Sequence, residues 1–96
     1  MNYLNSLALA CALFLTAPAF AEIVNVNQAD AAALAQNLNG IGEAKAQKII
    51  EYREQHGGFK SLDELANVPG IGAKTVERNR DNMSLDKGVT KVDEQG

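Results

Sequence analysis

The sequence predicts an all-α domain built from two similar units, each with a tight turn between two helices. The tripeptide Gly40-Ile41-Gly42 recurs 30 residues later as Gly70-Ile71-Gly72. Apolar residues recur at helical spacing on both sides of each turn, and a glycine stands where each preceding helix has to end. A period of this size indicates a repeat, in which two units that bury little apolar area alone share one core.

The N-terminal stretch is typical of a secretory signal peptide and is not expected to belong to the fold. Residues 1–21 contain no Asp, Glu, Lys or Arg, and they hold an apolar run over 7–15, the breaker Pro18 and a small-x-small triplet that ends at Ala21. We predict cleavage after Ala21, with an uncleaved N-terminal anchor as the alternative. The apolar run is shorter than the roughly 20 residues of a membrane-spanning helix, so we expect no integral membrane span after cleavage.

The first unit is expected to begin with a short extended lead-in over 22–26. Asn27 is a good helix N-cap, and Asp30 then falls in the first helical turn, where a carboxylate is favoured. These signals predict a helix over 28–37, which Gly40 ends because glycine tolerates positive φ.

A second helix is predicted over 43–55, and the glycine pair at 57–58 ends it. Ser61 and Glu64 then form the pattern of a capping box, in which serine is the N-cap and glutamate reaches back to it. This pattern predicts a short third helix that ends near Asn67.

The last helix is predicted over 73–82. Asn79 occupies a position where the helical period would place an apolar residue, which we expect to loosen the core locally. Leu85 closes the predicted domain of residues 27–85, and the polar, aperiodic residues 86–96 are expected to form a disordered tail. The predicted shared core consists of Leu34, Leu38, Ile41, Ile49, Ile50, Phe59, Leu62, Leu65, Val68, Ile71, Val76 and Met83.

The charge of the chain does not resemble that of a typical nucleic-acid-binding protein. The whole sequence has 9 basic and 12 acidic residues and a net charge of −3, and residues 27–85 carry seven basic and eight acidic side chains. Any phosphate binding must therefore come from local geometry and not from a global field. The basic side chains outside the turns are interpreted as solvated surface, namely Lys48, Arg53, Lys60, Arg78 and Arg80.

The sequence argues against an enzyme, and we expect no catalytic residues, no metal site and no cofactor. One histidine, and a Cys11 that is lost on signal cleavage, leave too few ligands for zinc. No nucleophile–base pair stands out, and so small a chain cannot enclose a substrate pocket of roughly 300 Å³ or more. Asp30, Asp63 and Glu64 are interpreted as helix caps, and His56 as a residue at a helix C-terminus.

The two Gly-Ile-Gly turns are candidate anion sites. In each, the first glycine turns the chain, the second leaves room for close approach to the backbone, and the isoleucine points inward. Amides of the glycines and of the residue after them would face solvent at a helix N-terminus, which suits phosphate. Lys45, Lys74 and Thr75 can add contacts, whereas Glu43 competes with an anion at the first turn. The candidate residues are Gly40, Ile41, Gly42, Lys45, Gly70, Ile71, Gly72, Lys74 and Thr75.

These turns resemble those of the tandem helix-hairpin-helix family. The family pattern is matched by residues 38–46 and again by residues 68–76, with Val76 in place of the final alanine. Three further segments, 24–30, 49–53 and 58–65, are similar to the ComEA-type periplasmic competence proteins. The resemblance covers residues 23–85, and it implies a SAM-like helical domain with two pseudo-symmetric motifs.

The resemblance also implies a function. It implies non-sequence-specific binding to double-stranded DNA through backbone phosphates, in the periplasm, as a DNA receptor for uptake in natural transformation. The implied partners are duplex DNA and the outer-membrane DNA-uptake machinery. The alternative is an envelope protein–protein interaction module with the same fold and no DNA binding, whose marker would be an exposed apolar patch.

Overall fold

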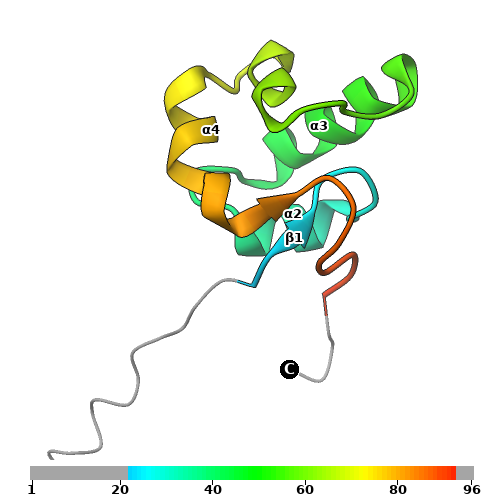
Figure 1. The fold of residues 1–96 in the computed structure, drawn as a ribbon, viewed down its shortest axis with the longest axis vertical. Coiled ribbons are helices and arrows are strands. Elements are labelled where there is room, and N and C mark those ends of the chain that lie inside the picture. The colour runs from blue at the N-terminus through cyan, green and yellow to red at the C-terminus, as the bar shows by residue number, and fades with distance from the viewer. Residues whose placement is uncertain (1–21, 93–96) are drawn as a thin grey trace, which may run out of the picture.

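The computed structural model describes residues 22–92 and shows a helical domain closed by a very small sheet (Figure 1). The all-α prediction with two helical units is confirmed, and the sheet is an addition to it. None of the helices in the described range is long and apolar enough to cross a membrane. The predicted signal peptide, 1–21, and residues 93–96 lie outside the described residues. The elements are β1 (Val24–Asn25), α2 (Ala31–Asn37), α3 (Glu43–His56), η1 (Leu62–Asn67), α4 (Ala73–Asn79), η2 (Arg80–Asn82) and β2 (Met83–Ser84).

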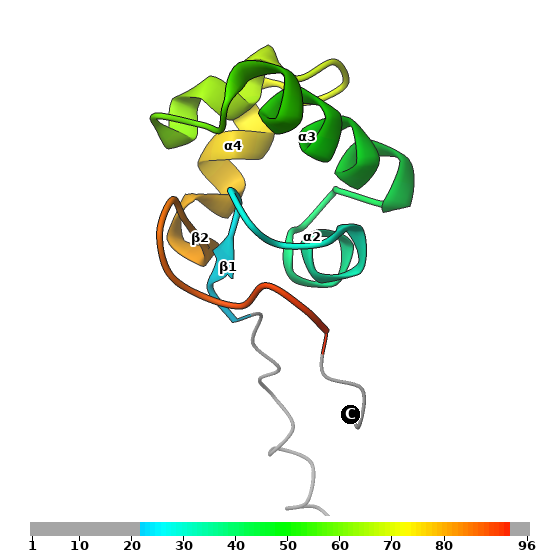
Figure 2. The ribbon, with the colours of Figure 1, turned by 90° about the vertical axis from the view of Figure 1, so that its right-hand side faces the viewer.

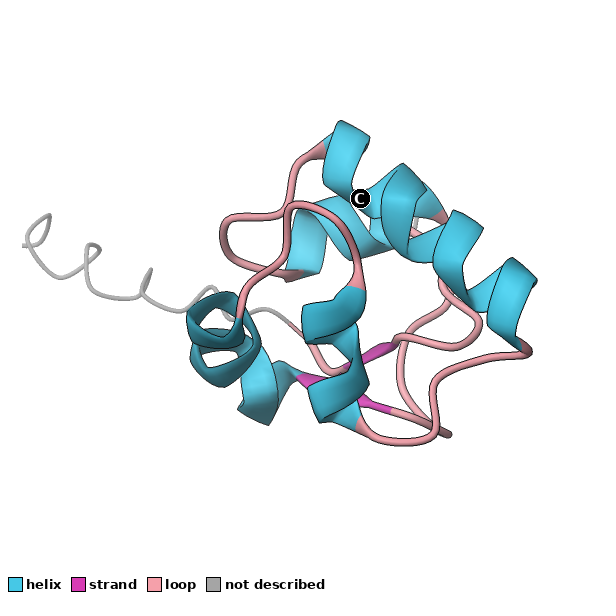
Figure 3. Ribbon diagram, turned by 90° about the horizontal axis from the view of Figure 1, so that it is seen from above, coloured by secondary structure: helices cyan, strands magenta, loops and turns pink. Residues whose placement is uncertain are grey.

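The two strands join the ends of the domain. They run parallel, with Val24 opposite Met83 and Asn25 opposite Ser84, and Figure 3 shows them as a short ladder among the helices. Val24 is fully buried. Residues 24–26 of the predicted extended lead-in (22–26) are therefore buried in the domain, and burial of their side chains stabilises so short a pair of strands.

Helix α2 begins three residues later than predicted. Asp30 is its N-cap and accepts a hydrogen bond from the amide of Ala33 at 2.9 Å. The prediction of Asn27 as N-cap is wrong, because its side chain bridges distant segments. Its amide nitrogen donates to the carbonyl oxygens of Phe59 and Leu85, both at 3.1 Å, and its oxygen accepts from the amide of Phe59 at 2.7 Å.

The predicted capping box at Ser61 is also wrong. The segment is the 3₁₀-helix η1, and the Ser61 side chain makes no cap hydrogen bond. Glu64 instead accepts from the backbone amide of Lys60 at 2.8 Å and from the hydroxyl of Tyr52 at 2.9 Å. These two hydrogen bonds lower the pKa of the Glu64 carboxyl, the bond from Lys60 contributing most. The tighter 3₁₀ geometry changes which amide lies within reach of the glutamate.

Ten of the twelve predicted core residues are buried, and Ile50 and Leu62 pack partly buried against them. The core also includes residues that the prediction left out, from the segment around β1 and from helices α2 and α3. The additional buried residues are Val24, Val26, Ala29, Ala33 and Ala46. All buried core residues lie between positions 24 and 83, so a chain that begins at Glu22 contains the whole described core.

Residues 86–92 differ from the predicted disordered tail. Val89 pairs with β1 on the side opposite β2, donating to the carbonyl of Ile23 at 2.8 Å and accepting from the amide of Asn25 at 3.0 Å. Thr90 then accepts from the amide of Asp30 at 2.9 Å. Figure 2 shows this orange-to-red segment passing beside β1 and α2. The backbone hydrogen bonds of an unpaired edge explain why so polar a segment is ordered.

Candidate nucleic-acid interface

One tight turn connects the two helices of each unit, and we name these turns the first hairpin (Gly40-Ile41-Gly42) and the second hairpin (Gly70-Ile71-Gly72). Gly40 has a φ of +82° and Gly70 a φ of +91°, a conformation that favours glycine. Ile41 and Ile71 are each only 5% exposed. The structure thus places each isoleucine side chain in the core, where its packing holds the turn in place. The contribution of Ile41 and Ile71 to a binding site would come from their backbone and not from these buried side chains.

The second glycine of each hairpin is a helix N-cap. Gly42 precedes α3 with φ −94° and ψ −170°, and Gly72 precedes α4 with φ −105° and ψ 175°. Neither position has a side-chain cap hydrogen bond. Helix α2, by contrast, is capped by Asp30. A methyl group at Gly42 or Gly72 would meet nothing within 4 Å, so the space above both caps is open.

The backbone amides around both hairpins are available to a ligand. Within residues 22–92, the first amide of α3 that donates a hydrogen bond within the helix is that of Ala46, and the first in α4 is that of Val76. No side chain in this range caps the amides that precede them. The amides ahead of them are the donors that every helix leaves unpaired at its start. These residues are exposed, and they are well suited to an anion such as phosphate. The exposed residues concerned are Gly40, Gly42, Glu43, Gly70, Gly72 and Ala73.

Each hairpin lies beside a cationic side chain from the other unit. A Cβ built at Gly40 would lie 3.4 Å from Nη1 of Arg78, which comes from α4. A Cβ built at Gly70 would lie 3.7 Å from Cε of Lys45, which comes from α3. Both side chains belong to exposed residues. Lys45 thus approaches the second hairpin, whereas its sequence position suggested a role at the first.

The remaining predicted site residues, Lys74 and Thr75, follow the second hairpin in helix α4. Lys74 is exposed in the first turn of α4, and Thr75 is half-buried. Glu43 is exposed as the first residue of α3, where its carboxylate would compete with a bound anion for the amides of the first hairpin. The corresponding position of the second unit is Ala73, so only the first hairpin carries this competing charge.

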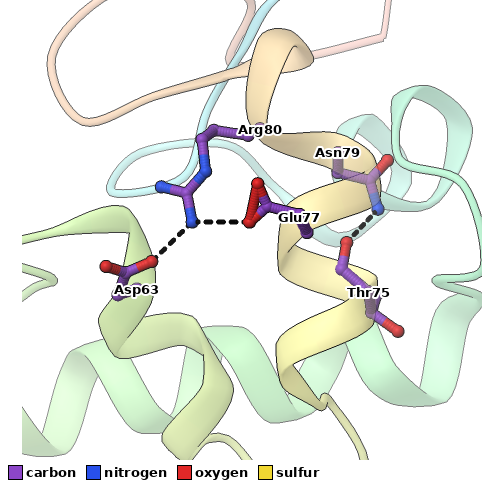
Figure 4. A network of polar contacts seen from close by, with 5 residues as sticks. All are labelled: Asp63, Thr75, Glu77, Asn79 and Arg80. Atoms are coloured by element: carbon purple, nitrogen blue, oxygen red, sulfur yellow. Dashed lines mark hydrogen bonds and ion pairs between the residues drawn. The ribbon is translucent and has the colours of Figure 1, made fainter.

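Two of the basic residues interpreted as solvated surface are held in specific contacts. Arg80 pairs with Asp63 at 2.6 Å and with Glu77 at 3.2 Å, as Figure 4 shows, and the hydrogen bond to Asp63 chiefly raises its pKa. Arg53 donates to the carbonyl oxygen of Val26 at 3.0 Å, and burial lowers its pKa. These two arginines serve the fold.

The expectation that Asn79 loosens the core is wrong. Asn79 is 1% exposed and its side chain is fully hydrogen-bonded. Its oxygen accepts from the amide of Asn39 at 2.7 Å, and its nitrogen donates to the carbonyl oxygens of Asn39 at 3.0 Å and Thr75 at 2.9 Å. Figure 4 shows the contact with Thr75 along α4.

Sequence reasoning missed Arg78 and Asn79 as neighbours of the first hairpin. One signal was present: the 30-residue register aligns Arg78 with Lys48, so both units carry a cation there. Nothing in the register indicated that the side chains would cross between units. No group of three or more His, Cys, Asp or Glu residues within 22–92 could hold a metal ion.

The comparisons with known proteins agree with this architecture. A family model described as the helix-hairpin-helix motif matches residues 20–84, and the chain belongs to this family. The resemblance to the tandem helix-hairpin-helix proteins is thereby confirmed.

Individual relatives narrow the class. The chain is 36% identical over 63 residues to ComE operon protein 1 of Bacillus subtilis, covering 66% of this chain and 30% of that protein. This bears out the ComEA-type resemblance. An uncharacterised protein of Haemophilus influenzae is 45% identical over 60 residues, covering 62% of this chain and 54% of its own length. The human endonuclease/exonuclease/phosphatase family domain-containing protein 1 is 44% identical over 57 residues, which are 10% of that protein. The chain thus spans about half or less of these relatives.

Proposed function

We propose that this protein binds double-stranded DNA through its backbone phosphates, with one phosphate held at each hairpin. The observation that carries the proposal is the pair of uncapped helix N-termini, each behind a positive-φ glycine and each beside a cation from the opposite unit. Backbone amides that are already fixed by the fold can donate to phosphate oxygens, so binding does not require a flexible side chain to become ordered. The seven-residue α4 has a small dipole, so at the second hairpin the amides and Lys45 supply most of the attraction.

The proposed binding carries no sequence preference. Both hairpins offer backbone amides and flexible cations, which read phosphate positions and not base edges. Recognition of bases would need planar side-chain donors and acceptors held rigidly in a groove, and the polar side chains held rigidly near the hairpins already bond to the protein backbone.

The cellular role that fits is that of a periplasmic DNA receptor for uptake in natural transformation. Two features support it: the similarity to ComE operon protein 1 of Bacillus subtilis and the signal-peptide pattern of residues 1–21. In this role the protein holds entering DNA and works with the outer-membrane DNA-uptake machinery.

The affinity of a single copy is expected to be modest. With roughly two to four phosphates neutralised, the logarithm of the binding constant should fall against the logarithm of salt concentration with a slope of about −2 to −4. Several copies along one duplex would raise the retention of DNA well above that of one copy.

The competing proposal is a protein-interaction module without DNA binding. Its expected marker was an exposed apolar patch, and among large hydrophobic residues within 22–92 only Ile23 is exposed, at 46%. One side chain does not make such a patch, so the cationic hairpin face is the better-supported surface.

The test is a duplex-DNA titration of residues 22–96 at two salt concentrations with unrelated sequences. We expect similar affinity for all sequences and weaker binding at higher salt. The double variant Lys45→Glu with Lys74→Glu should abolish binding with helicity unchanged. Its matched control is Lys87→Glu with Lys91→Glu, which makes the same charge change in the segment beside β1. Persistent binding by the folded hairpin variant would exclude the hairpins, and no binding by the native chain at low salt would favour the interaction module.

A further inference from the structure

We propose that Asn79 is a positioning residue for the first hairpin, so that the second unit holds the first hairpin in its DNA-binding shape. This inference rests on the proposed function and adds that the two hairpins are coupled, because α4 follows the second hairpin in the chain and contacts the first. Asn79 is the last residue of α4, and α4 begins at the second hairpin.

The contact that carries the inference is a two-point hydrogen bond between Asn79 and the backbone of Asn39. The side-chain oxygen accepts from the Asn39 amide at 2.7 Å and the side-chain nitrogen donates to the Asn39 carbonyl at 3.0 Å. The second hydrogen of that nitrogen is donated to Thr75 at 2.9 Å. Reversing the amide would place NH₂ against N–H and oxygen against two carbonyls, so only one orientation satisfies all three contacts.

Asn39 is a position where the chain needs outside support. It is exposed, and it directly precedes Gly40, which adopts positive φ. The turn around Asn39 and Gly40 is closed by one long backbone hydrogen bond, 3.4 Å from the Ile41 amide to the Leu38 carbonyl, whereas the equivalent bond at the second hairpin is 3.0 Å. This single long bond constrains the dihedral angles of Asn39 only weakly. The Asn79 amide binds both the donor and the acceptor of this one residue and thereby fixes the entry to the first hairpin.

In the second hairpin a proline, and not a side-chain hydrogen bond, fixes the backbone before the first glycine. Pro69 stands in the register of Asn39, and its ring fixes φ and removes the amide hydrogen. In the register of Asn79 stands Ile49, which is fully buried and apolar. The two units therefore differ in both positions together. The hairpin with Pro69 is paired with the apolar Ile49, and the hairpin with Asn39 is paired with the side-chain amide of Asn79.

Arg78 adds a second link from α4 to the same place. Its guanidinium nitrogen lies 3.4 Å from the Cβ position of Gly40, while the adjacent Asn79 holds Asn39. Two consecutive residues of α4 thus act on the first hairpin, one on its shape and one on its charge. A change in the position of α4 would alter both.

The test compares two asparagines that make the same number of backbone hydrogen bonds. Asn79→Leu removes the contacts to Asn39, and Asn27→Leu is the matched control, since Asn27 also makes three such bonds but to Phe59 and Leu85. In residues 22–96, we expect Asn79→Leu to weaken duplex-DNA binding about tenfold and to make the salt slope shallower by about one. Amide exchange should accelerate at residues 39–43 and stay native at residues 69–73. Asn27→Leu should lower Tm without changing the salt slope.

A rescue variant separates positioning from stability. Adding Asn39→Pro to Asn79→Leu gives the first hairpin the arrangement of the second, and Leu38, at φ −112° and ψ 130°, already has a backbone that suits a following proline. We expect this double variant to recover the native salt slope. If Asn79→Leu does not fold, the double variant and the exchange rate of the Asn39 amide in the native chain carry the test.

The outcomes separate this inference from the proposed function. Native binding and native exchange at residues 39–43 in folded Asn79→Leu would overturn the inference and leave the proposed function standing. Absence of DNA binding by the native chain would overturn the proposed function, and the exchange measurement would still decide whether Asn79 positions the hairpin. A loss of binding that matches the loss in Asn27→Leu would show a merely structural role and overturn the inference.

Discussion

Replacing Gly42 by aspartate should stabilise the domain and weaken its binding to DNA. Helix α2 supplies the template, because its N-cap Asp30 has φ −83° and ψ 175° and accepts from the amide three residues later. Gly42 has nearly the same backbone, φ −94° and ψ −170°, and a Cβ there would meet nothing within 4 Å. In Gly42→Asp the new carboxylate would accept from the amide of Lys45 and occupy the site proposed for phosphate.

The expected stabilisation is small and positive. Aspartate at an N-cap is a few tenths of a kcal/mol better than glycine. Its charge at the start of a 14-residue helix adds about 0.3–1 kcal/mol, reduced by the neighbouring Glu43. A net gain of about 0.5–1 kcal/mol corresponds to a rise in Tm of roughly 2–8 °C for a domain of this size.

Thermal unfolding by circular dichroism and a duplex-DNA titration at two salt concentrations measure the two effects. The control is Gln55→Glu, which adds the same charge to α3 about 20 Å along the helix from Gly42. We expect Gly42→Asp to bind about tenfold more weakly than this control and with a salt slope shallower by about one. A variant with raised Tm that binds as the control does would refute phosphate binding at these amides.

Three further perturbations test other parts of the molecule. Glu43→Ala should strengthen DNA binding a few-fold, because it removes the carboxylate that competes for the first hairpin, and unchanged affinity would mean that no phosphate comes near it. Gly88→Ala should destabilise the domain by about 1–3 kcal/mol in a denaturant titration, since φ is +109° and the new Cβ would lie 2.5 Å from the carbonyl oxygen of Ile23; native stability would contradict the observed pairing of this segment. Because the folded-state pKa of Glu64 is lowered, its contribution to stability is complete above the ordinary carboxyl pKa and is lost as the pH falls through the lowered value. Glu64→Gln should therefore show less loss of Tm between pH 5 and pH 2–3 than the native chain (approximate limits), and an identical acid profile would exclude this carboxyl as the cause.

The features predictable from sequence are those set by neighbours in the chain. Positive φ at Gly40 and Gly70 follows from the need to end a helix and turn within two residues, which glycine does with least strain. The extent of α3 follows from its apolar spacing and from Gly57, whose φ of +77° ends it. Burial of the isoleucine within each hairpin follows from the alternation of glycine with a large apolar side chain.

The features that were missed depend on residues far apart in the sequence. Asn27 and Asn79 resemble ordinary helix-end and mid-helix polar residues, yet each bonds to backbone that is 32 or 40 positions away. Local propensity describes what asparagine does with its own neighbours, and it says nothing of a carbonyl that tertiary packing brings near. The crossing of Lys45 to the opposite hairpin has the same origin, because it depends on how the two units pack.

The placement of charge reconciles the proposed DNA binding with the slightly acidic composition of the domain. At physiological salt the screening length is about 8 Å, so acidic side chains on remote surfaces contribute little at the hairpins. Ion pairs within residues 22–92 involve Arg80, which is committed to Asp63 and Glu77, whereas Lys45 and Arg78 lie beside the hairpins. Glu43 is the acidic residue that opens α3 at the first hairpin, and no counterpart opens α4 at the second. Affinity should therefore follow these few local charges and not the net charge, and substitutions that make the remote surface more acidic should slow association more than they weaken equilibrium binding.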